Sequence, residues 1–114
     1  MASYRELIAW QKAMTLAETV YEVTRSFPAD ERFGLTNQLR RAAVSVPSNI
    51  AEGHGRQSRA DFVRFLRIAL GSVREIETQL LLAGRLGFAD ATKVGLITGD
   101  AEEVARLLFG LIRC

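Results

Sequence analysis

The feature that most constrains the fold is an apolar repeat between residues 62 and 83. Its spacings are 4, 3, 4, 3, 4 and 3, in the series Phe62, Leu66, Ala69, Val73, Ile76, Leu80 and Ala83. Alternating steps of three and four place side chains on one face of an α-helix, and a repeat of three heptads is typical of helices packed nearly parallel. The sequence therefore predicts a long helix, from about Ser58 to Gly87, that packs along other helices.

Three further segments carry the same periodicity. They cover about residues 4–26, residues 28–55 and residues 91–113, with apolar rows that include Trp10 to Val20, Leu35 to Ile50, and Val94 to Leu111. The chain of 114 residues has only two prolines and shows no alternating strand pattern. Four amphipathic helices with short connections predict an all-α fold, an up-down-up-down antiparallel four-helix bundle, in a single domain over residues 1–114.

The second helix has a proline in mid-pattern. Pro47 cannot donate a backbone hydrogen bond and its ring crowds the preceding turn, so we expect a Pro-kinked second helix. Two separate helices meeting near Ser45 are the alternative, but the apolar spacing keeps its phase through Pro47 and favours one helix. We expect this helix to begin at Pro28 and to end at the glycines around His54, with a left-handed glycine closing it.

Caps are predicted at two other helix starts. Ser58, three residues before Asp61, resembles a capping box for the third helix, and Asp90 is a suitable first cap for the fourth.

Charge is distributed unevenly, although the net charge is only +2. Residues 32–74 contain eight arginines and two acidic residues, a net charge of +6, while each end of the chain carries −2. Arginine matches phosphate bidentately, so this segment indicates a nucleic-acid partner, RNA or DNA. The alternative is a solvated helix face making surface ion pairs. The candidate phosphate contacts are Arg40, Arg41, Arg56, Arg59, Arg64 and Arg67.

Polar residues form two rows within the apolar helices. Spacings of three and four place Gln38, Arg41, Ser45, Asn49 and Glu52 on one face of the second helix, and Ser72, Glu75 and Gln79 on one face of the third. If the rows meet, they predict a hydrogen-bonded network that fixes the helix register, with Arg41 and Glu75 as an ion pair. A ligand or partner site is the alternative.

Several classes of function lack the residues that they need. One histidine and one terminal cysteine cannot form a closed metal site, and His54 has the position of a helix-end residue rather than a catalytic base. No cofactor motif is present, so we expect a protein that is not an enzyme. The lone Cys114, the absence of a leader-like start and the absence of a long apolar run favour a cytoplasmic protein without a membrane partner.

A family resemblance rests on several runs of residues. The runs are YREL (4–7), WQKA (10–13), QLRRAAVSVPSNIAEG (38–53), ALGS (69–72) and EIETQL (75–80). Together they resemble the four-helix-bundle proteins encoded by intervening sequences within bacterial large-subunit ribosomal RNA genes, over about residues 4–112. The segment from Pro47 to Gly53 is the most specific part.

The resemblance implies a cytoplasmic bacterial homo-oligomer, a pentameric ring around a central channel, with no known catalytic activity. A related branch, the accessory variability determinant proteins of diversity-generating retroelements, is similar in fold. Its basic pentamer binds a reverse transcriptase and nucleic acid. The resemblance therefore implies self-association, nucleic acid, and a protein partner such as a reverse transcriptase as expectations for this chain.

Overall fold

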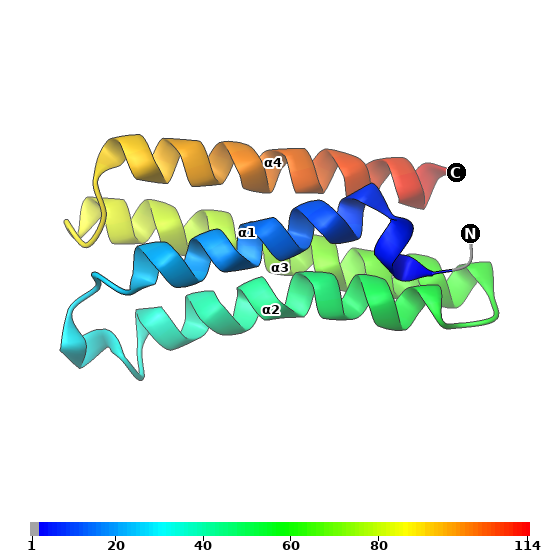
Figure 1. Ribbon diagram of the computed structural model, residues 1–114, viewed down its shortest axis with the longest axis horizontal. Helices are drawn as coiled ribbons and strands as arrows, with labels where there is room; N and C mark the ends of the chain where they lie inside the picture. The colour runs from blue at the N-terminus through cyan, green and yellow to red at the C-terminus, as the bar shows by residue number, and fades with distance from the viewer. Residues whose placement is uncertain (1–2) are drawn as a thin grey trace.

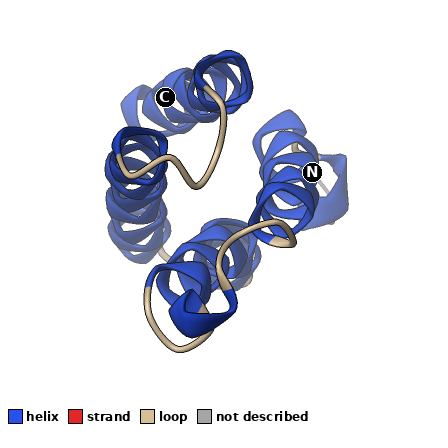
Figure 2. Cartoon of the chain, turned by 90° about the vertical axis from the view of Figure 1, so that its left-hand side faces the viewer, coloured by secondary structure: helices blue, strands red, loops and turns tan. Residues whose placement is uncertain are grey.

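Four long helices make up the computed structural model, which describes residues 3–114. They are α1 (Ile8–Thr24), α2 (Leu35–His54), α3 (Arg59–Arg85) and α4 (Ala91–Arg113). Each helix packs against the next in sequence, and α1 also packs against α4, which closes the bundle (Figures 1 and 2). No strand occurs in residues 3–114. The predicted all-α antiparallel four-helix bundle is confirmed.

The heptad row of α3 lies at the centre of the core. Leu66, Val73, Ile76 and Leu80 are 0% exposed, as their spacing predicted. They meet fully buried residues from the other three helices, which include Leu16, Val20, Leu39, Val46, Ile50, Val104 and Leu108. Burying each such side chain contributes about 1.5–3 kcal/mol, so this core is the main source of the bundle's stability.

The N-terminal segment differs from its prediction as one helix from Tyr4. It forms a short 3₁₀ helix, η1 (Tyr4–Glu6), and Leu7 is extended before α1 begins at Ile8. The Ser3 hydroxyl accepts from the Arg5 N–H at 3.1 Å, and the Glu6 carboxylate accepts from the Ser3 N–H at 3.1 Å. These local caps complete a separate turn, so the prediction of one continuous helix was wrong at this end.

The start of α2 also differs from its prediction at Pro28. A second 3₁₀ turn, η2 (Ala29–Glu31), follows Pro28, and α2 begins only at Leu35. The Glu31 carboxylate accepts the Leu35 N–H at 2.9 Å, and Gly34 stands at the N-cap position between them. The carboxylate therefore caps a helix that starts one loop later than the periodicity indicated.

Helix α2 is continuous through Pro47, which excludes the alternative of two separate helices. The kink stays a prediction. At the other end of α2, Gly55 has φ −76°, so the predicted left-handed closure was wrong there, and its N–H bonds to the carbonyls of Ala51 and Glu52 as in a continuing turn. Among the described glycines only Gly87, after α3, has a positive φ, at 78°.

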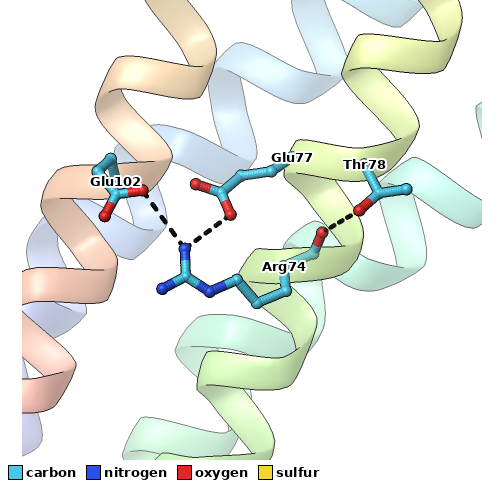
Figure 3. Close-up of polar contacts among 4 residues, drawn as sticks. All are labelled: Arg74, Glu77, Thr78 and Glu102. Atoms are coloured by element: carbon cyan, nitrogen blue, oxygen red, sulfur yellow. Dashed lines mark hydrogen bonds and ion pairs between the residues drawn. The ribbon is translucent and has the colours of Figure 1, made fainter.

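Arg74 ties helix α3 to α4 through two carboxylates (Figure 3). The Arg74 Nη1 lies 2.9 Å from Glu77 Oε1 on its own helix and 3.3 Å from Glu102 Oε2 on α4. The hydrogen bond that Arg74 donates to the Glu77 carboxylate raises the pKa of Arg74 above its ordinary value. The guanidinium therefore stays charged and links the two helices at the surface.

Candidate nucleic-acid interface

The two polar rows meet where α2 contacts α3. The hydroxyl oxygens of Ser45 and Ser72 lie 2.8 Å apart, and Ser72 is buried. The Asn49 Nδ2 donates to the Ser45 carbonyl at 2.8 Å and to the Ser45 hydroxyl at 3.0 Å. Small side chains at this level allow a direct hydrogen bond between the helices. Each hydroxyl therefore has a hydrogen-bond partner in a partly buried environment.

A groove with polar walls opens next to this contact. It has a volume of about 310 Å³ and is called the polar groove below; its lining residues are Asn37, Gln38, Arg41, Ala42, Ser45, Ser72, Glu75 and Gln79. The Gln79 Nε2 donates to the Gln38 Oε1 over a long 3.4 Å, and the Gln79 Oε1 is buried without a hydrogen-bond partner. The wall of the polar groove therefore contains the Gln79 amide, whose nitrogen makes only a long hydrogen bond and whose oxygen has no donor within residues 3–114.

Arg41 and Glu75 both line the polar groove, and both are exposed. In the described part of the chain they form no ion pair with each other or with another side chain. The suggested ion pair between them is therefore not present. A cationic donor and an anionic acceptor are available to a ligand in the same groove.

Glu52 does not join the other polar residues of its row. Its Oε2 lies 2.9 Å from the Nη2 of Arg56, which is four residues later in the chain. Both side chains are about half exposed. The structure therefore brings Ser45, Asn49 and Ser72 together and separates Glu52 from them.

Three of the candidate arginines lie around two phenylalanines at the turn between α2 and α3. The guanidinium groups of Arg56 and Arg64 lie over the Phe65 ring, at 5.0 and 4.6 Å from its centroid. Arg59 lies over Phe62 at 5.9 Å and also donates to the Ile112 carbonyl at 2.8 Å. Stacking on a ring face leaves N–H groups at the edge of a guanidinium available to other acceptors. These arginines are therefore held in position and can still donate hydrogen bonds.

The remaining candidate arginines fall into two groups. Arg40 is half-buried over the Tyr21 ring at 4.6 Å and donates to the Thr24 hydroxyl at 2.8 Å, so it ties α2 to α1. Arg67 and Arg41 are exposed and have no polar partner among residues 3–114. All six arginines therefore lie on or next to α2 and α3, but the side chain of Arg40 is directed to α1.

Acidic groups near the turn offset part of this charge. Arg56 is paired with Glu52, and the Arg64 Nε lies 3.8 Å from Asp61. Both pairs are exposed, and such pairs are weak enough to exchange for a phosphate. The His54 ring lies edge-on to Phe62 at 6.0 Å, at the end of α2, in the position of a helix-end residue.

A second groove was not predicted from the sequence. It lies between α1 and α2, has a volume of about 760 Å³, and is lined by apolar and aromatic side chains that include Trp10, Met14, Tyr21, Val44 and Pro47. The available signal was that Met14 and Tyr21 widen the apolar face of α1 beyond its core row. Both are 40% exposed in the structure.

Residues 3–114 contain neither a cluster of metal-binding side chains nor a helix able to span a membrane. No group of three or more His, Cys, Asp or Glu side chains is arranged to hold a metal ion. No helix in the described part of the chain combines the length and apolar character required to cross a membrane.

Comparisons with known proteins show a family and a similar solved structure. A family model described as 23S rRNA-intervening sequence protein matches residues 5–110. The chain is also similar to a crystal structure of a protein of unknown function from the S23 ribosomal protein family of Bacteroides thetaiotaomicron, with a TM-score of 0.84 and 28% identity over 94% of this chain and 100% of that one. No curated protein matches the chain.

Proposed function

We propose a function from one premise: the chain belongs to the 23S rRNA-intervening sequence protein family. The proposed function is non-enzymatic binding of nucleic acid by a homo-oligomer in the bacterial cytoplasm, with five copies as the family resemblance implies. The α2–α3 pair of helices is the proposed binding face, and arginines that contact phosphates are the proposed ligands.

The observation that carries this proposal is the set of oriented arginines on one pair of helices. Arg56 and Arg64 share the Phe65 ring, while Arg67 and Arg41 are exposed farther along the same helices. A guanidinium already held on a ring loses less side-chain entropy when it binds a phosphate. Arg41 lies in α2 and Arg56 lies just beyond the C-terminal end of that helix, 15 residues away, which corresponds to roughly 20 Å at the helical rise. That length suits several consecutive phosphates.

Self-association supports nucleic-acid binding because a single chain is only weakly basic. The net charge of +2 per chain becomes +10 in a pentamer. Linked copies that bind one nucleic acid gain avidity without new contacts. Exposed apolar side chains favour such an assembly: Leu81 and Leu82 on α3, and Leu86 at its C-cap, are between 45% and 55% exposed.

A titration of structured RNA at low salt tests the proposal. Fluorescence anisotropy should detect binding by the wild type and a loss of at least tenfold when Arg56, Arg64 and Arg67 are changed to glutamine. A matched control removes three charges from α4 instead, at Lys93, Arg106 and Arg113, and should bind nearly as the wild type does. A wild type that binds neither RNA nor DNA at low salt would overturn the proposal.

The α1–α2 groove favours a second candidate function, a protein-interaction scaffold or accessory subunit. A groove of about 760 Å³ with Trp10, Tyr21 and Met14 in its wall suits the apolar side chains of a partner. A retroelement reverse transcriptase is the partner that the family resemblance implies. Co-purification of the wild type with such an enzyme, lost in Val44→Glu, would support this function. Failure of the wild type to co-purify would count against it.

A further inference from the structure

We propose that the polar groove between α2 and α3 binds an unpaired guanine base. This inference rests on the proposed binding of nucleic acid and adds which base the protein reads. It starts from Glu75, whose carboxylate lines the groove and has no ion pair within residues 3–114. A carboxylate repels phosphates, so it does not help a face that binds only the nucleic-acid backbone. It becomes favourable where a base donates N–H groups to it.

The other groups in the groove match one base. The Arg41 guanidinium is a free bidentate donor, and the Gln79 Oε1 is a buried acceptor without a partner. Guanine presents the O6 and N7 acceptors that arginine contacts bidentately, and its N1–H and N2–H₂ donors suit a carboxylate. Adenine presents an amino donor where Arg41 needs an acceptor. Cytosine and uracil lack the two adjacent donors that match Glu75.

A bound guanine can replace the contacts that the residues of the polar groove now make with each other. The Gln38–Gln79 hydrogen bond is long, at 3.4 Å, so a base that replaces it sacrifices little. The Ser72 hydroxyl is already used by Ser45 and forms the floor. A volume of about 310 Å³ is large enough for a purine base.

The aromatic rings at the turn between α2 and α3 are not free to stack on a base. Single-stranded nucleic acids are commonly held by bases that stack on exposed aromatic side chains. Phe65 is only 7% exposed and carries two arginines over its ring, and Phe62 is half-buried beside Arg59. The arginines stacked on these rings are therefore placed for phosphates, and the polar groove with Arg41 is the place for a base. Ile68, one turn before Ser72 and 44% exposed, offers an apolar contact to the face of the base.

The test compares labelled single-stranded RNAs of equal length that carry one central G, inosine, A or C in a run of U. Anisotropy at low salt should show the G-containing RNA binding about tenfold tighter than the A-containing one. Inosine, which lacks the N2 amino group, should lose most of that preference. Glu75→Gln should abolish the preference while all-U RNA binds as well as before or better. A matched control, Glu103→Gln on α4, should leave the preference unchanged.

Two results would contradict the inference, and they differ in scope. Equal binding of all four RNAs by the wild type would overturn guanine recognition while the proposed nucleic-acid binding stands. Absence of binding to every one of these RNAs would overturn this inference, and the proposed function fails with it only if structured RNA and DNA are not bound either. A G preference that persists unchanged in Glu75→Gln would assign the recognition to other residues and so reject the polar groove as its site.

Discussion

The hydroxyl oxygens of Ser45 on α2 and Ser72 on α3 lie 2.8 Å apart, in a direct hydrogen bond between the two helices. Ser72→Ala removes one partner of a buried pair, so we expect a loss of about 1 kcal/mol in the free energy of unfolding, measured by urea denaturation. Ser72→Leu should lose more, about 1–3 kcal/mol, because the added volume pushes the helices apart. Exposed Ser48→Ala, the control, should change stability by less than about 0.5 kcal/mol. Equal stability of Ser72→Ala and the wild type would show that the contact contributes nothing.

The residues of the α2 polar row should differ in their contribution to stability. Asn49 donates two hydrogen bonds to Ser45, so Asn49→Ala should lose about 1 kcal/mol. Glu52 and Arg56 form an exposed pair, and either alanine variant should lose about 0.5 kcal/mol or less. The spacing of the row had placed Glu52 in the same network as Asn49, which predicts a larger loss for either alanine variant than for Arg56→Ala. A Glu52→Ala loss as large as that of Asn49→Ala would return Glu52 to the network.

The four helices could be predicted because the period of their apolar rows extends over many turns. The heptads of α3 and the start of α4 after Asp90 were predicted correctly, and the Asp90 side chain accepts the Lys93 N–H at 2.9 Å. The breaks before Ile8 and before Leu35 were missed. At both places, local hydrogen bonds from side chains form a separate turn or make the helix begin later. The periodicity of apolar residues does not reveal such hydrogen bonds.

The candidate site was predictable in composition and not in detail. The distribution of charge along the sequence located the basic segment. The spacing of the polar rows placed Ser45 and Ser72 on helix faces that could meet. The partners of Arg40 and Arg59 depend on tertiary contacts with Tyr21 and with the end of α4, which no local pattern specifies. The α1–α2 groove likewise depends on how far two helices separate at the surface.

Two glycines inside helices should respond oppositely to alanine. A Cβ at Gly53 would lie 2.6 Å from the Phe65 Cβ and 3.1 Å from the Phe62 Cδ1, so α3 approaches α2 there too closely for a side chain. Gly53→Ala should therefore destabilise the fold by about 1–3 kcal/mol. A Cβ at Gly71 meets no atom within 4 Å, and Gly71→Ala should stabilise by about 0.5–1 kcal/mol through helix propensity. Melting temperatures that shift in the same direction for both variants would contradict the close approach.

The two ion pairs of Arg74 should differ in strength. Glu77 is 17% exposed and its Oε1 lies 2.9 Å from Arg74 Nη1, while Glu102 is 48% exposed with its Oε2 at 3.3 Å. Double-mutant cycles should give a larger coupling energy for Arg74 with Glu77 than with Glu102, the latter about 0.5 kcal/mol or less. High salt should reduce both. A larger coupling across the helices than within α3 would contradict this arrangement.

The salt dependence of RNA binding tests the central claim most directly, because only phosphate contacts release counterions. If Arg56, Arg64 and Arg67 each neutralise one phosphate, the logarithm of the binding constant should fall against the logarithm of the salt concentration with a slope of about −2 per bound chain. Arg67→Gln should make the slope shallower by about 0.7. A slope near zero, or a slope that Arg67→Gln leaves unchanged, would contradict phosphate binding by the α2–α3 face.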